Sequence, residues 1–178
     1  MKRPSRRSFI AAGIAVPIAA CGRRGSPWRF FTVEEARMVE AVCAQIIPED
    51  QDAGAAKAGV VHFMDTQLTR FYKPLQKTYR RGIAQIDQAS IDFAGKPFAD
   101  LASAQQVAVL HHIETHAELR PFFDLLVAHT MQGFYGDPRH GGNRDRVSWK
   151  MVGLPYPPLR GRLRYDFADP KKGELPWR

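Results

Sequence analysis

Apolar side chains in this sequence recur at helical spacing, and no stretch of any length alternates with the period of two that a strand requires. The pattern is clearest after Thr32, where Ala36 and Cys43 fall on one helical face and Pro48 ends the run. Thr32 and Glu35 have the spacing of a capping box, which satisfies amide groups in the first helical turn. A chain with this pattern is predicted to be all-α.

Further helices are predicted from the same periodicity. One runs from about Lys57 to Phe71, another from Pro74 to Gly95, and a third starts at a second predicted capping box, Ser103-Ala-Gln-Gln106. The segment 122–131 is too apolar for a surface helix, so it is predicted to be the central one. The sequence therefore predicts a single domain of about five helices, with a Gly/Pro-rich C-terminal loop and an extended basic tail.

The character of the chain changes at Gly133. The stretch GFYGDPRHGGN, residues 133–143, is rich in residues that fix turns, which predicts a tight and specified loop. The segment 156–178 holds four prolines among alternating arginines and aromatic residues, and is either a disordered tail or an arm laid on a partner.

The N-terminus is typical of an export signal. Arg6 and Arg7 are followed at fixed spacing by Phe9 and an aliphatic residue, as in twin-arginine signals. The apolar stretch 9–20 is shorter than the ~20 residues that a spanning helix needs. Cys21 ends a lipobox-like segment and is either the lipidated first residue of the mature chain or incidental to cleavage near Ala20. Residues 1–20 are thus interpreted as a signal peptide, 21–30 as a linker and 31–155 as the helical domain.

The charge of the chain is concentrated at its ends. The formal net charge is +8, of which four charges belong to the predicted signal, and residues 144–178 hold nine Lys/Arg against four Asp/Glu. Residues 21–143 are close to neutral, and a nucleic-acid partner is not expected for an exported chain. The basic tail is interpreted as a solvated arm, or as one that contacts acidic lipid headgroups or an acidic protein surface. Cys43 is either a buried inert thiol or one half of an intersubunit disulfide.

No motif for catalysis or cofactor binding is evident. The chain lacks GxGxxG, CxxCH and GxSxG patterns, so neither catalytic nor cofactor-binding residues are predicted. His112 and His116 lie one helical turn apart and could share a metal ion, but a third ligand is missing from that face. No metal site is predicted, and a His-metal exported enzyme is kept as an alternative function.

Several segments together resemble the gluconate 2-dehydrogenase subunit 3 family, the small subunits of membrane-bound flavoprotein dehydrogenases. The most specific stretch is Thr130–Pro138, which runs into Gly141-Gly142-Asn143 and then Trp149 and Gly153. The other segments that carry the resemblance are the twin-arginine leader, Phe31-Thr32 with Ile46-Ile47-Pro48, Gly59-Val60 with Phe63-Met64-Asp65, and Phe98 with Leu101. The similarity covers roughly residues 30–155.

The resemblance implies a non-catalytic subunit without a cofactor of its own. In such complexes a large FAD-bearing (GMC-type) subunit commonly lacks an export signal and crosses the membrane folded, as a passenger of the small subunit, through the twin-arginine translocase. A cytochrome c subunit often completes the complex. The location expected is the periplasmic side of the cytoplasmic membrane.

The surface expected to bind the large subunit consists of the 133–143 loop, Trp149 and the arm that follows. Its residues are Phe134, Tyr135, Asp137, Pro138, Gly141, Gly142, Asn143 and Trp149. Aromatic anchors and arginines are favoured at protein interfaces. The second alternative function is a free-standing exported helical lipoprotein with a structural role in the envelope.

Overall fold

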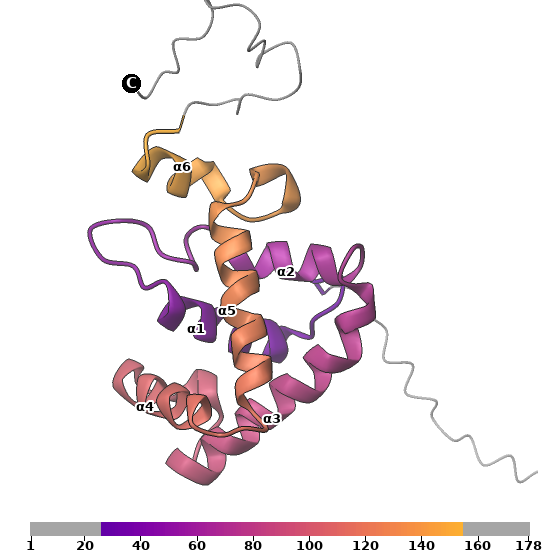
Figure 1. The fold of residues 1–178 in the computed structure, drawn as a ribbon, viewed down its shortest axis with the longest axis vertical. Helices are drawn as coiled ribbons and strands as arrows, with labels where there is room; N and C mark the ends of the chain where they lie inside the picture. The colour runs from indigo at the N-terminus through magenta and orange to yellow at the C-terminus, as the bar shows by residue number, and fades with distance from the viewer. Residues whose placement is uncertain (1–25, 155–178) are drawn as a thin grey trace, which may run out of the picture.

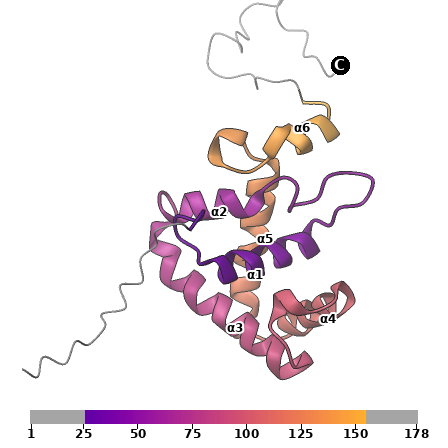
Figure 2. The same cartoon turned by 180° about the vertical axis from the view of Figure 1, so that it is seen from behind.

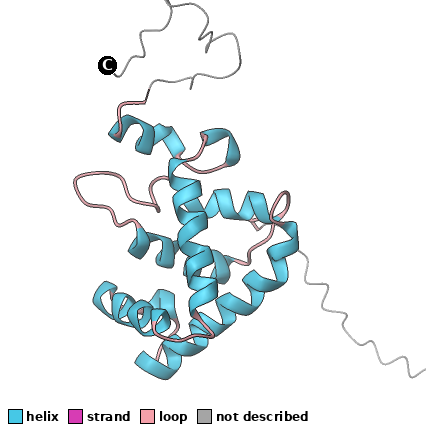
Figure 3. Ribbon diagram, viewed as in Figure 1, coloured by secondary structure: helices cyan, strands magenta, loops and turns pink. Residues whose placement is uncertain are grey.

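The computed structural model describes residues 26–154, which form helices and no strand (Figure 3). The six α-helices are α1 (Val33–Ile46), α2 (Val60–Leu68), α3 (Gln76–Ala94), α4 (Ser103–Glu114), α5 (Arg120–Tyr135) and α6 (Val147–Met151). Four short 3-10 helices join them: η1 (Lys73–Leu75), η2 (Phe98–Asp100), η3 (Pro138–His140) and η4 (Arg144–Arg146). This confirms the all-α prediction. The predicted export signal, Cys21 and the 156–178 arm lie outside the described residues.

Helix α5 is the central element, as its apolar sequence predicted. Figures 1 and 2 show it running the length of the domain, with α1 and α2 on one side and α6 packed at its C-terminal end. Pro121 occupies its first turn, where no amide hydrogen is required. Its fully buried Leu126 and Phe134 belong to one core with residues of α1, α2, α3 and α4.

The capping box of α1 is confirmed, but that of α4 is not. The Thr32 hydroxyl accepts from the Glu35 amide at 3.1 Å, and the Glu35 carboxylate accepts from the Thr32 amide at 2.8 Å. In α4 the residue at the N-cap is Ala102, whose amide donates to the Gln105 side chain at 3.2 Å. Ser103 is the first residue of the helix, and its hydroxyl pairs with Gln45 of α1 instead. The predicted second capping box is therefore wrong, because the helix starts one residue too early for Ser103 to accept a first-turn amide.

The segment that precedes Phe31, from residue 26 on, is also part of the folded domain. Trp28 stacks on His62 of α2 with ring centroids 4.6 Å apart, and Phe30 is 5% exposed. The sequence placed both residues in a linker, and the chain that follows Trp28 is held by Asp65 of α2. Its carboxylate accepts from the backbone amides of residues 29, 30 and 31 at 2.8, 2.8 and 3.0 Å. A buried carboxylate with three amide donors is fully satisfied, so Asp65 fixes where the chain enters the domain.

Candidate functional site

The segment after α5 folds back onto the helix through a close contact between two glycines. A Cβ built on Gly142 would lie 2.2 Å from the carbonyl oxygen of Gly133, and one built on Gly133 would lie 3.0 Å from side chains of α2. Gly141 has a φ of 105° and its backbone passes over that of His62. Any larger side chain at these positions would push the loop off α2 and α5. The glycines of the motif thus serve close packing.

Asn143 holds the shape of this loop from the inside. It is fully buried with a φ of 46°, and its side-chain amide donates to the Gly136 carbonyl at 2.9 Å. Its Oδ1 accepts from the Ser148 amide at 3.1 Å, at the start of α6. One side chain therefore joins the end of α5 to the beginning of α6, and Asn suits the position because it tolerates the left-handed region.

Helix α6 caps the C-terminal end of α5. The last carbonyls of a helix have no partner within it and must find one elsewhere. The Ser148 hydroxyl donates to the Phe134 carbonyl at 2.6 Å, and the Trp149 indole donates to the Tyr135 carbonyl at 2.8 Å. The short helix is thereby fixed on the longer one by hydrogen bonds as well as by the buried tryptophan.

The predicted partner-binding residues divide into two groups. Phe134, Gly142, Asn143 and Trp149 are buried, so their side chains support the loop and α6 from within. Tyr135 and Gly141 are exposed, while Asp137 and Pro138 are half-buried. The predicted loop also begins later than expected, since Gly133 to Tyr135 form the last turn of α5. The buried group therefore cannot contact a partner directly in this conformation.

An exposed apolar surface lies at this end of the molecule instead. Tyr135 is 46% exposed and is the last residue of α5, and Val152 is 58% exposed and directly follows α6. Figure 1 shows α6 at the C-terminal end of α5. We call this surface the apolar end; its residues are Met131, Tyr135, Met151, Val152 and Leu154. Sequence reasoning missed all of these except Tyr135. Helix α6 is too short to give a periodic signal, and Met131 lies in the helix that was predicted to be central. Tyrosine and methionine are enriched at protein interfaces.

A polar cluster joins α3 and α5 to Tyr72, which lies in the turn after α2. His129 stacks on Tyr72 with ring centroids 4.2 Å apart, and its Nδ1 is hydrogen-bonded to the Tyr79 hydroxyl at 2.6 Å. Burial lowers the pKa of His129 below its ordinary value and raises that of Tyr79 well above its own. Both groups are therefore held neutral near pH 7. This chemistry suits a satisfied core cluster.

Cys43 is buried and chemically quiet. It is 1% exposed, and burial raises the pKa of its thiol to about 12. The Thr130 hydroxyl donates to the Leu126 carbonyl at 2.7 Å, so its oxygen is left to accept from the thiol, 3.3 Å away. A thiol without access to solvent cannot reach a partner chain. The intersubunit disulfide is therefore incompatible with this packing, and the buried inert thiol is the alternative that fits.

His112 of α4 and His116, two residues beyond the end of that helix, are only half-buried and exposed, respectively. The rings of His112 and His116 have centroids 3.9 Å apart, and His116 Nδ1 lies 2.6 Å from the His112 carbonyl oxygen. Within residues 26–154 no three His, Cys, Asp or Glu side chains gather in a way that could hold a metal ion.

Comparison with protein families decides where the chain belongs. The family model described as gluconate 2-dehydrogenase subunit 3 matches residues 33–155. The chain belongs to the gluconate 2-dehydrogenase subunit 3 family. Neither the curated proteins nor the solved structures gave a match.

The structure accounts for the residues by which this subunit 3 chain resembles its family. The match covers the whole helical domain and includes the glycine contact, the Asn143 bridge and the Trp149 cap described above. Asp65, another residue of the resemblance, ties down the N-terminal entry. None of the helices between residues 26 and 154 is long and apolar enough to cross a membrane. The family motif thus maintains a rigid C-terminal cap and a fixed N-terminal entry.

Proposed function

We propose that this chain is the non-catalytic small subunit of a membrane-associated FAD-dependent sugar or sugar-acid dehydrogenase. In this role it binds, stabilises and escorts the large flavin subunit through twin-arginine export. The family description supports an accessory subunit of a gluconate dehydrogenase complex. The FAD lies in the large subunit, and a cytochrome c subunit completes the complex.

The observation that carries the proposal is the apolar end, which is exposed yet rigidly supported. Five exposed apolar side chains lie on the last two turns of α5 and at the end of α6 or just after it, while the buried Asn143 and Trp149 join these two segments by hydrogen bonds. A surface that is already ordered loses little conformational entropy when it binds. We infer that the large subunit docks on this end and that the buried motif residues keep it in shape.

The twin-arginine leader supports the escort half of the proposal. Arg6 and Arg7 address the chain to a translocase that carries folded proteins, and no cofactor motif in the sequence explains that route. A bound, folded flavoprotein explains it. Cys21, if acylated, anchors the complex on the periplasmic side of the cytoplasmic membrane.

Co-purification from native membranes tests the docking surface. The tagged chain is expected to bring down a large subunit with flavin absorption, and the double variant Tyr135→Asp/Val152→Asp is expected to lose it. The control Ile91→Asp/Val107→Asp places two charges on α3 and α4 at side chains 42% and 40% exposed, and should co-purify normally. Equal recovery of flavin with both variants would place the docking surface elsewhere, and recovery of no flavoprotein with the unmodified chain would remove the proposal.

A further inference from the structure

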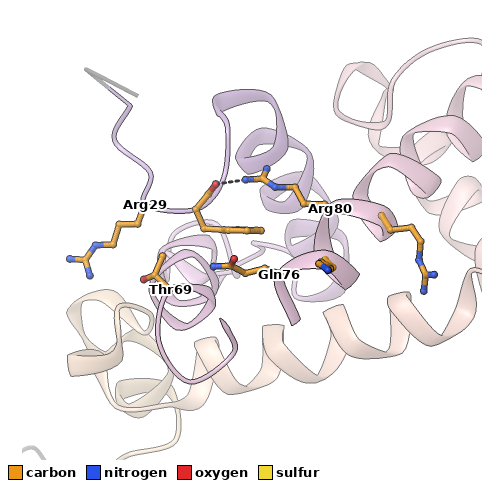
Figure 4. Close-up of a pocket in the computed structure, with 7 residues that line it drawn as sticks. Arg29, Thr69, Gln76 and Arg80 are labelled. Atoms are coloured by element: carbon orange, nitrogen blue, oxygen red, sulfur yellow. Dashed lines mark hydrogen bonds between the residues drawn. The ribbon is translucent and has the colours of Figure 1, made fainter. Parts of the chain in front are cut away.

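A basic pocket lies where the N-terminal segment meets the C-terminal end of α2 and the first two turns of α3. It shares no residue with the apolar end. The pocket has a volume of about 490 Å³. Four cationic side chains line it, namely Arg29, Lys77, Arg80 and Arg81, with Phe30, Thr69 and Gln76 completing the wall (Figure 4). The segment that joins Asp65 to Asp87 contains five Lys/Arg and no acidic residue.

One of these cations is held in place by other groups of the pocket wall, and among the described residues the other three have no such partner. The Arg80 guanidinium lies 4.1 Å over the Phe30 ring, donates to the Phe30 carbonyl at 2.7 Å and pairs with Glu35. The other three lining cations are exposed and form no ion pair within residues 26–154. Lys77 and Arg81 stand one turn apart on the same face of α3, where like charges repel. An anion in the pocket would relieve that repulsion.

An exposed aromatic side chain follows Thr69 of the pocket wall by two residues and lies among further cations of the same segment. Phe71 is 81% exposed, more than any other large apolar side chain within residues 26–154, and it lies between Arg70 and Lys73 in the sequence. An aromatic ring flanked by lysine and arginine is the pattern by which proteins rest on anionic bilayers, with the ring at headgroup depth and the cations against the phosphates. An isolated soluble anion would leave this ring unexplained.

We propose that the basic pocket and Phe71 form a bilayer-contact surface that binds the phosphate groups of anionic phospholipids. Arg29 follows Cys21 by eight residues, which span at most about 28 Å when fully extended. A lipid on Cys21 would therefore keep the pocket close to the headgroups. The inference deepens the proposed membrane-side location, but it requires neither the large subunit nor the lipid on Cys21.

The first test is binding of the purified full chain to vesicles. Vesicles of phosphatidylcholine with 30% phosphatidylglycerol are compared with pure phosphatidylcholine by co-sedimentation at low salt. The variant Arg29→Gln/Lys77→Gln/Arg81→Gln is expected to bind the anionic vesicles roughly 100-fold more weakly, since each cation near such a surface contributes about fivefold. The control Lys96→Gln/Arg120→Gln/Lys150→Gln removes the same charge from exposed sites elsewhere and should retain binding within about threefold of the unmodified chain.

A second measurement reports contact at Phe71 itself, independently of any binding by the leader. An environment-sensitive fluorophore is attached at Phe71→Cys in the Cys21→Ser chain, where buried Cys43 does not compete for the label. Its emission should shift to the blue with anionic vesicles, the shift should be lost in the triple pocket variant, and a label at Ile91→Cys should not respond. No shift at residue 71, or an equal shift with and without the pocket cations, overturns the proposal.

Inorganic phosphate separates the lipid from a free anion. Millimolar phosphate that raises the melting temperature of the chain but not of the triple pocket variant, without any fluorophore shift on vesicles, would assign the pocket to a soluble phosphate and overturn the membrane contact. Because the vesicle tests use the small subunit alone, their failure would leave the docking of the large subunit unaffected. Failure of co-purification would likewise leave the vesicle result standing.

Discussion

Replacing Asp65 should destabilise the whole domain, because its carboxylate is the acceptor for three consecutive backbone amides. Asp65 is 3% exposed, and the amides of Phe30 and Phe31 that it accepts are buried with it. The amide of Arg29 is only partly buried, so water can replace its partner. The substitution Asp65→Ala leaves the two buried amides without an acceptor.

The magnitude follows from these contacts. A hydrogen bond to a charged group contributes about 1.5–3 kcal/mol, so losing two buried ones should cost about 3–6 kcal/mol of the free energy of unfolding. In Asp65→Asn the remaining oxygen can still accept from Phe30 and Phe31, and the new NH₂ group faces the Arg29 amide. Asp65→Asn should therefore cost about 1–3 kcal/mol, because its two remaining bonds go to a neutral oxygen and the NH₂ group keeps water from the Arg29 amide. A domain of this size is stabilised by about 5–15 kcal/mol in total, so Asp65→Ala should lie near the limit of folding.

Urea unfolding followed by circular dichroism and tryptophan fluorescence measures both variants. Asp92→Ala is the control, because Asp92 is exposed and, among residues 26–154, accepts a hydrogen bond from Gln88 on the same helix alone. It should stay within about 0.5 kcal/mol of the unmodified chain. The reasoning is refuted if Asp65→Ala is as stable as the control, or if Asp65→Asn is as unstable as Asp65→Ala.

Three further predictions concern the glycine contact and the buried titratable groups. Gly142→Ala should lower the free energy of unfolding by about 2–3 kcal/mol, because the added Cβ clashes with Gly133. Gly95→Ala has open space around it and should cost about 1 kcal/mol, from its φ of 77° alone. Thermal unfolding compares the two variants. Because burial lowers the pKa of His129, the unfolded chain binds a proton below about pH 6.5 that the folded chain does not, so stability should fall as the pH falls below that value. Urea midpoints at pH 7.5 and 5.5 measure this loss, and it should shrink in His129→Gln. Cys43, with its pKa near 12, should react with a thiol reagent at pH 8 only after unfolding; rapid labelling of the native Cys21→Ser chain would contradict its burial.

Local signals in the sequence were sufficient to predict the main helices. These signals are the capping box at Thr32 and Glu35, the first-turn proline of α5 and the apolar periodicity. Each reflects contacts within a few residues, so each can be recognised without knowledge of the fold. The second predicted helix was too long at both ends, because Gly59 adopts the left-handed conformation and turns follow Leu68. Helix ends depend on such single backbone positions.

The parts that could not be predicted depend on distant contacts. The end of α5 includes Gly133, a poor helix former, because only glycine fits against Val60 and Phe63 of α2. The basic pocket joins Arg29 to residues that lie about fifty positions later in the chain, and no local pattern connects them. The motif residues were expected to face a partner, whereas several are buried. In a single sequence, a residue that contacts a partner cannot be told apart from one that packs inside the domain.

The most direct test of the escort role is the location of the large subunit in cells. When the small subunit is produced with Arg6→Lys/Arg7→Lys, we expect the large flavin subunit to remain in the cytoplasm, still bound to the small one. With the unmodified leader, both subunits should be found outside the cytoplasmic membrane. If the large subunit is exported normally beside the altered leader, the chain is not its escort, and the central claim fails.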